Sequence, residues 1–111
     1  MWKLSRKFCS SIYKVTSKFP EAEKFGLVSQ LRRASISVPS NIAEGSAKSS
    51  DKHFLVFLET SLGSCYEMET QLLVSNDLEF INDETLADLL KLLETNIQML
   101  SKFMSYLKGK L

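Results

Sequence analysis

The chain has 111 residues, a length that allows a single domain with one hydrophobic core. It contains only four Gly and two Pro, its apolar residues are mostly Leu with Met and Phe, and its net charge is +1. This composition favours helices over short strands. No run approaches the roughly 20 apolar residues that span a bilayer, and basic residues interrupt the N-terminal region where a signal peptide would lie. We therefore expect one all-α, cytoplasmic domain over residues 1–111, without a membrane segment.

The first predicted helix covers residues 3–19 and is amphipathic. Leu4, Phe8 and Ile12 recur at intervals of four on one face, while lysines gather on the opposite face. The helix is expected to end at Phe19, because a residue before proline is pushed out of the α region. Pro20 then suits the first turn of the next helix.

The second predicted helix runs from Pro20 to Gly45. Its apolar positions follow helical spacing, and Gly45 is expected to close it in the left-handed cap conformation. Pro39 removes one backbone hydrogen bond and crowds the preceding turn. We expect a kink near residues 35–38, with a complete break as the alternative.

The third predicted helix begins after a cap at Ser49 or Ser50, and Gly63 in its middle indicates close approach of another backbone. The fourth begins at Asn82 or Asp83 and carries two adjacent apolar stripes, which predicts burial within the bundle or partly against another subunit. Long helices with short loops pack most simply as an antiparallel up-down-up-down four-helix bundle.

Charge is distributed unequally along the chain. Residues 1–50 carry nine Lys/Arg and three Asp/Glu, a net +6, whereas residues 51–111 carry five and ten, a net −5. The two halves either complement each other, within a fold or between subunits, or the basic half faces a polyanion.

One face of the first helix is a candidate nucleic-acid site. Its basic stripe, with two arginines of the second helix, comprises Lys3, Arg6, Lys7, Lys14, Lys18, Arg32 and Arg33. A basic stripe of this kind can bind successive phosphates of a nucleic acid, and an ordinary solvated helix face with the same sequence pattern is the alternative. No aromatic residue lies inside the stripe to stack on a base.

A second candidate is a structural polar network between the second and third helices. Its members are Arg33, Ser37, Asn41, Glu44, Ser64 and Glu67. Arg32 or Arg33 is expected to pair with Glu67 or Glu44 and fix the helix register, and a solvated face is the alternative. A hydrolytic carboxylate pair, Glu44 with Glu67, is a weaker hypothesis that requires the two groups to lie close together.

No other motif indicates an enzyme, a metal site or a cofactor. His53 is the one histidine and is expected to be solvated, and the chain has no phosphate-binding glycine loop. Cys9 and Cys65 are isolated at apolar spacing, so we expect two reduced, buried thiols, with a disulfide between them as the alternative.

Several short motifs carry a family resemblance. They are Phe19-Pro20-Glu21, Phe25-Gly26-Leu27, Gln30-Leu31-Arg32-Arg33-Ala34, the run from Ser37 to Gly45, Phe54-Leu55, Gly63-Ser64 and Glu67. From about Trp2 to Leu107 the chain resembles the four-helix bundle proteins, also called 23S rRNA intervening-sequence or S23 proteins. The resemblance implies a left-handed antiparallel bundle that assembles into a homopentamer. A related branch, the accessory proteins of diversity-generating retroelements, binds nucleic acid and a reverse transcriptase.

Two hypotheses for function follow. The first is a non-enzymatic, homo-oligomeric helical scaffold that docks RNA, DNA or a nucleic-acid-associated partner through the basic stripe. The alternative is a purely structural oligomer in which the basic half of one subunit complements the acidic half of the next.

Overall fold

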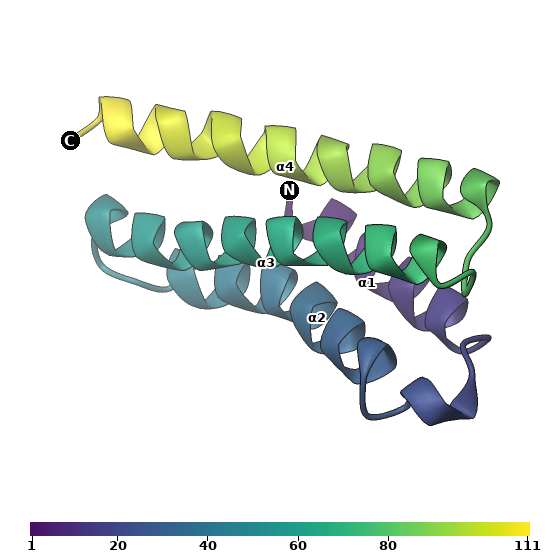
Figure 1. The fold of residues 1–111 in the computed structure, drawn as a ribbon. Coiled ribbons are helices and arrows are strands. Elements are labelled where there is room, and N and C mark those ends of the chain that lie inside the picture. The colour runs from purple at the N-terminus through teal and green to yellow at the C-terminus, as the bar shows by residue number, and fades with distance from the viewer.

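The computed structural model describes residues 1–111 and consists of four α-helices and one short 3₁₀ helix. The helices are α1 (Trp2–Thr16), η1 (Glu21–Glu23), α2 (Leu27–Ser46), α3 (Asp51–Asp77) and α4 (Asp83–Gly109). Successive α-helices run in opposite directions (Figure 1). The prediction of an all-α four-helix bundle is therefore confirmed, while the left-handed twist stays a prediction.

The starts of the two long helices match the capping residues expected from sequence. The Ser50 side chain accepts a hydrogen bond from the His53 amide at 3.1 Å, and Asn82 Oδ1 accepts one from the Thr85 amide at 2.8 Å. Each bond satisfies an amide that has no partner inside the helix. These caps fix where α3 and α4 begin after their short loops.

The junction between α1 and α2 differs from the prediction. α1 ends at Thr16, and Pro20 starts only the single 3₁₀ turn of η1, so α2 begins seven residues later than expected, at Leu27. Gly26 has φ −107° and ψ −115°, outside the helical region, and separates the two elements. Glu23 Oε1 then accepts a hydrogen bond from the Leu27 amide at 3.3 Å, which supplies a cap from outside the helix.

The predicted roles of two glycines were wrong. Gly45 does not adopt a left-handed conformation, because α2 continues through it to Ser46 and no glycine in the chain has positive φ. A Cβ at Gly45 would lie 2.7 Å from Phe57 Cβ and 2.8 Å from Phe54 Cδ1, whereas a Cβ at Gly63 would meet nothing within 4 Å. Gly45, not Gly63, therefore permits close packing of two helices.

Helix α2 is continuous through Pro39, so the alternative of a complete break is wrong. The ribbon curves away from α3 in its N-terminal half (Figure 1). Val38 and Pro39, at the C-terminal side of the predicted kink, are both buried. The Val38 carbonyl accepts a hydrogen bond from Ser61 Oγ of α3 at 2.9 Å. This bond ties the middle of α2 to α3.

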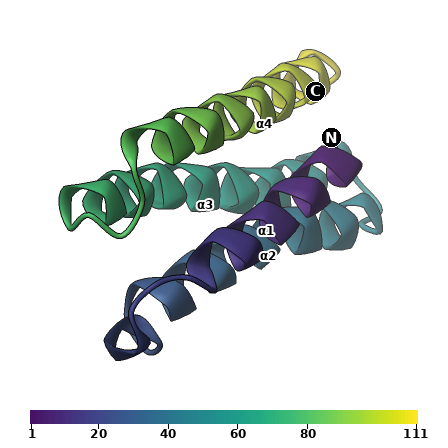
Figure 2. The same cartoon turned by 90° about the vertical axis from the view of Figure 1, so that its right-hand side faces the viewer.

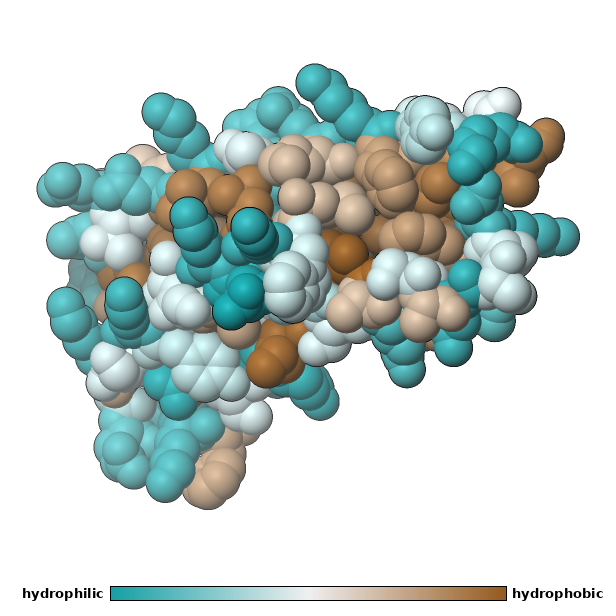
Figure 3. Space-filling view, turned by 180° about the vertical axis from the view of Figure 1, so that it is seen from behind, coloured by the Kyte–Doolittle hydropathy of each residue, from teal (hydrophilic) through white to brown (hydrophobic).

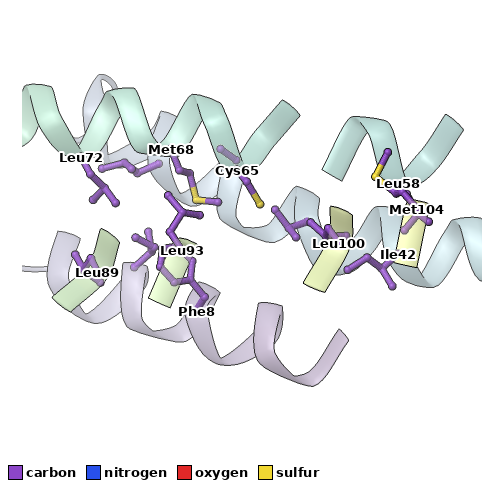
Figure 4. Packing of buried hydrophobic residues seen from close by; sticks show 14 of the residues in the cluster. Phe8, Ile42, Leu58, Cys65, Met68, Leu72, Leu89, Leu93, Leu100 and Met104 are labelled. Carbon is purple, nitrogen blue, oxygen red and sulfur yellow. The ribbon is translucent and has the colours of Figure 1, made fainter. Parts of the chain in front are cut away.

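One continuous core joins all four helices. Nineteen apolar residues are buried in a single cluster, with contributions from α1 (Phe8), α2 (Ile42), α3 (Leu58) and α4 (Leu93). Figure 4 draws part of this cluster and shows side chains from different helices pointing toward one another. Burial of this apolar surface is the main favourable contribution to folding.

α1 covers only part of the bundle. It has 15 residues against 27 in α4, and its N-terminus lies near the middle of the long helices (Figure 1). α1 and α4 also diverge toward the η1 end (Figure 2). The C-terminal half of α4 consequently keeps an uncovered flank, where Met1, Met99, Lys102 and Phe103 line a groove of about 520 Å³. Figure 3 shows apolar surface extending toward this end of the molecule.

Candidate nucleic-acid interface

A cationic groove lies between α1 and α2 near the start of the chain. Lys3, Arg6 and Lys7 of α1 line it together with Cys9, Ser10, Ile36 and Pro39, and its volume is about 430 Å³. The amphipathic pattern of α1 positions these cations, because burying Phe8 and Ile12 turns the basic face outward. Three cations of the predicted basic stripe therefore lie together beside an apolar strip of α2.

No acidic side chain neutralises this groove. α1 contains no Asp or Glu, and the only ion pair in the structure joins Lys110 Nζ and Asp51 Oδ2 at 3.0 Å, outside the groove. Lys14, which is exposed further along the same helix, and Lys18, which is exposed in the turn after it, also form no ion pair. Several unpaired cations on one face produce a positive potential that attracts phosphate groups.

The two arginines of α2 differ from each other. Arg32 turns back to α1, where Nε donates to Thr16 Oγ1 at 2.9 Å, Nη2 donates to the Tyr13 carbonyl at 3.2 Å, and the guanidinium lies 4.6 Å from the centre of the Tyr13 ring. Arg33 is exposed and forms neither a hydrogen bond nor an ion pair through its side chain. Arg32 thus holds the end of α1 on α2, and Arg33 is free to meet a ligand.

Two aromatic residues of α1 lie near the groove without lining it, and sequence reasoning missed them. Trp2 is 43% exposed and Tyr13 is 40% exposed, and each ring is stacked with an arginine, Arg6 over Trp2 at 4.6 Å and Arg32 over Tyr13 at 4.6 Å. The spacing of positions 2, 6, 9 and 13, in steps of four, three and four, places them on one helix face beside α2. This regular spacing is the sequence signal that could have identified the two aromatic residues.

The polar network between α2 and α3 forms in part. Ser64 Oγ donates to Ser37 Oγ at 3.0 Å, and Asn41 Nδ2 donates to Ser37 Oγ at 3.0 Å and to the Ser37 carbonyl at 2.8 Å. These three half-buried side chains cross-link the helices in one register. The structure therefore brings together three of the six predicted members.

The remaining three members lie outside that cluster. Arg33 and Glu44 are exposed and unpaired, and Glu67 accepts a hydrogen bond only from Gln71 Nε2, at 3.1 Å. The predicted pairing of Arg32 or Arg33 with Glu67 or Glu44 is wrong, because Arg32 binds Thr16 and Tyr13 instead.

The hypothesis of a hydrolytic carboxylate pair is also wrong. Glu67 lies three residues beyond Ser64, whereas Glu44 lies seven residues beyond Ser37 in the opposite direction along the bundle, which separates them by about 15 Å at 1.5 Å per residue. Both carboxylates are exposed, so neither lies in a water-excluding pocket.

Both cysteines are free thiols, so the alternative of a disulfide between them is wrong. Cys65 is buried, and burial raises the pKa of its thiol to about 12. Cys9 is half-buried and accepts a hydrogen bond from Ser35 Oγ at 3.3 Å. His53 is exposed, as expected, and its nearest aromatic neighbour is Phe57.

His, Cys, Asp and Glu side chains form no cluster of three or more that would hold a metal ion. None of the helices combines the length and the hydropathy needed to cross a bilayer.

The fold and its charged groove define a small antiparallel helical bundle with one cationic face. The chain belongs to the 23S rRNA-intervening sequence protein family, whose sequence model matches residues 1–102. It is similar to a crystal structure of a protein with unknown function from the S23 ribosomal protein family of Bacteroides thetaiotaomicron, with a TM-score of 0.83 over 93% of this chain and 96% of that one. The two chains are 23% identical, a likeness that shows the fold alone. No curated protein sequence matches this chain.

Proposed function

We propose that this protein is a non-enzymatic, self-associating helical scaffold that binds nucleic acid through the groove between α1 and α2. The observation that supports this function is the set of cations in the groove, Lys3, Arg6 and Lys7, none of which has an acidic partner. The family name refers to 23S rRNA, which makes RNA the first polyanion to test. The relation to retroelement accessory proteins stays a prediction.

Phosphate binding on this face has a measurable consequence. Each contact between a cation and a phosphate releases counterions, so the logarithm of affinity falls linearly with the logarithm of salt concentration, by about 0.7 to 0.9 per contact. The part of the stripe from Lys3 to Lys14 follows α1 for about 16 Å at 1.5 Å per residue, and Lys18 lies just beyond the end of the helix. A bound strand that contacts several of these cations will show a correspondingly steep slope.

The test is a titration of fluorescently labelled structured RNA, followed by anisotropy over a range of salt concentrations. The double variant Lys3→Ala/Lys7→Ala should bind more weakly and lose about 1.4 to 1.8 from the salt slope. The matched control, Lys52→Ala/Lys91→Ala, removes two exposed lysines of α3 and α4 and the same charge. Equal effects of the two double variants would contradict a specific role for the groove.

Self-association is proposed from the uncovered flank of α4. Met99 and Tyr106 are exposed there by 38% and 60%, and Leu92, on the same face one heptad earlier, is exposed by 43%, although their spacing is that of buried helix positions. A second copy packed on this flank would bury them. The homopentamer implied by the family resemblance is the expected assembly, and light-scattering mass after size-exclusion chromatography tests it. A Met99→Asp variant should lower the mass, and a wild-type monomer would contradict the proposal.

The second candidate function is a purely structural oligomer without a nucleic-acid ligand. It is favoured by a groove of opposite charge between α3 and α4, in which Glu69 and Glu94 flank Tyr66, Leu73, Leu90 and Ile97. The basic face of α1 in one copy would complement this groove in the next. Under this candidate, added salt dissociates the assembly, whereas a nucleic-acid scaffold loses RNA with salt and keeps its mass.

A further inference from the structure

Two accessible aromatic rings, of Trp2 and Tyr13, lie near the cationic groove between α1 and α2 without lining it, and Arg6, which does line it, lies over the Trp2 ring. Trp2 and Tyr13 are eleven residues apart on α1, or about 16 Å along the helix axis. Lys3, Arg6 and Lys7 lie between or beside them, and Ile36 and Pro39 of α2 form the neighbouring apolar wall. Phosphate-binding and ring-stacking groups therefore lie on adjacent faces of α1.

Burial in the core does not account for the positions of these two rings. Trp2 and Tyr13 stay more than one-third exposed, and neither the indole Nε1 nor the phenol Oη forms a hydrogen bond within the chain. By contrast, Phe8 and Phe19 of the same segment are buried. Each exposed ring is instead stacked with a guanidinium group, of Arg6 or Arg32, and such planes also stack on nucleobases.

From this arrangement we infer that the groove binds single-stranded nucleic acid, with bases stacked on the Trp2–Arg6 and Tyr13–Arg32 pairs and phosphates on Lys3 and Lys7. The inference rests on the proposed nucleic-acid function and specifies its ligand. In a duplex the flat faces of the bases are covered by their neighbours, so only an unpaired strand can offer them to these rings. A site that used charge alone would bind both forms.

Trp2 is the only tryptophan of the chain, so intrinsic fluorescence reports on this site directly. The probes are an oligouridylate, an oligothymidylate of equal length, and an RNA duplex of that length. The single strands should quench Trp2 emission with saturation, and the duplex should leave it nearly unchanged. Comparing the oligouridylate with the oligothymidylate shows whether the 2′-hydroxyl is recognised. Stacking alone should bind both strands, whereas recognition of the 2′-hydroxyl should favour the RNA strand.

The variants separate stacking from charge. Trp2→Leu and Tyr13→Leu should each lower affinity for the single strand roughly tenfold, as expected for the loss of one stacked base, with an unchanged salt slope. The matched control is Tyr66→Leu, which removes an exposed tyrosine from the groove between α3 and α4 and should leave affinity unchanged. Circular dichroism melting curves show whether each variant is folded, and the wild-type quenching measurement needs no variant.

The outcomes separate single-strand recognition at the two rings from nucleic-acid binding in general. Tight, salt-dependent binding of single strand and duplex alike, without quenching of Trp2 and without an effect of the leucine variants, would overturn this inference and leave the proposed function standing. Absence of binding to any of the three probes at low salt would overturn both. Quenching by the single strands together with the tenfold losses supports the inference.

Discussion

Two glycine-to-alanine substitutions in this bundle should have opposite effects on stability. Gly45 of α2 and Gly63 of α3 both lie inside helices, where Ala is favoured over Gly by about 1 kcal/mol. At Gly63 the added methyl group meets nothing within 4 Å, so Gly63→Ala should gain that full amount. At Gly45 the methyl group would lie 2.7 Å from Phe57 Cβ. Because Cβ atoms cannot move without the backbone, overpacking should cost about 2 kcal/mol, and the net loss is about 1 kcal/mol.

Equilibrium unfolding in urea, followed by circular dichroism at one protein concentration, measures both effects. The Gly63→Ala midpoint should rise and the Gly45→Ala midpoint should fall, and the corresponding melting temperatures should move by roughly 4 to 8 °C in opposite directions. Two shifts of the same sign would refute the conclusion that α2 and α3 pack closely at Gly45.

Arg32→Ala should destabilise the protein by about 1 to 2 kcal/mol, because it removes the hydrogen bonds to Thr16 and Tyr13. Arg33→Ala removes no such bond and should change the free energy of unfolding by less than about 0.5 kcal/mol. Chemical denaturation of the two variants compares these effects. In the native protein a thiol-specific reagent should modify Cys9 much faster than Cys65, and a Cys9→Ser variant should lose the fast phase. The pKa of the Cys65 thiol is raised from 9.0 to about 12 in the folded protein, so between these pH values the unfolded state binds fewer protons than the folded state. The free energy of unfolding should therefore fall as pH rises through this range. In Cys65→Ala, which lacks the thiol, this fall should be shallower, as measured by denaturation at several pH values.

Features that depend on neighbours along one helix were predictable from sequence. The caps Ser50 and Asn82 and the buried faces of α1 and α4 follow from local hydrogen bonding and helical periodicity, and the structure contains them. The single core and the four-helix architecture follow from those faces and the short loops.

Features that depend on contacts between helices were predicted less well. A glycine in a helix indicates only that space is scarce or that backbone freedom is needed. How α2 and α3 are rotated against each other decides that Gly45 packs closely against α3 and that Gly63 faces open space. In the same way, Arg32 reaches Thr16 because the turn at η1 returns α2 alongside α1, a contact between residues 16 positions apart. Pairing with Glu44 or Glu67 was chemically reasonable, but those side chains lie elsewhere.

Binding of nucleic acid at the groove between α1 and α2 is tested most directly by footprinting of lysine side chains. Acetylation followed by mass spectrometry, with and without a bound oligouridylate, compares Lys3, Lys7, Lys14 and Lys18 with the exposed lysines of α3 and α4, which serve as controls in the same molecule. We expect the ligand to protect the lysines of the first group and to leave Lys52, Lys91 and Lys108 reactive. Equal protection of both groups, or protection confined to α3 and α4, would contradict the proposed interface.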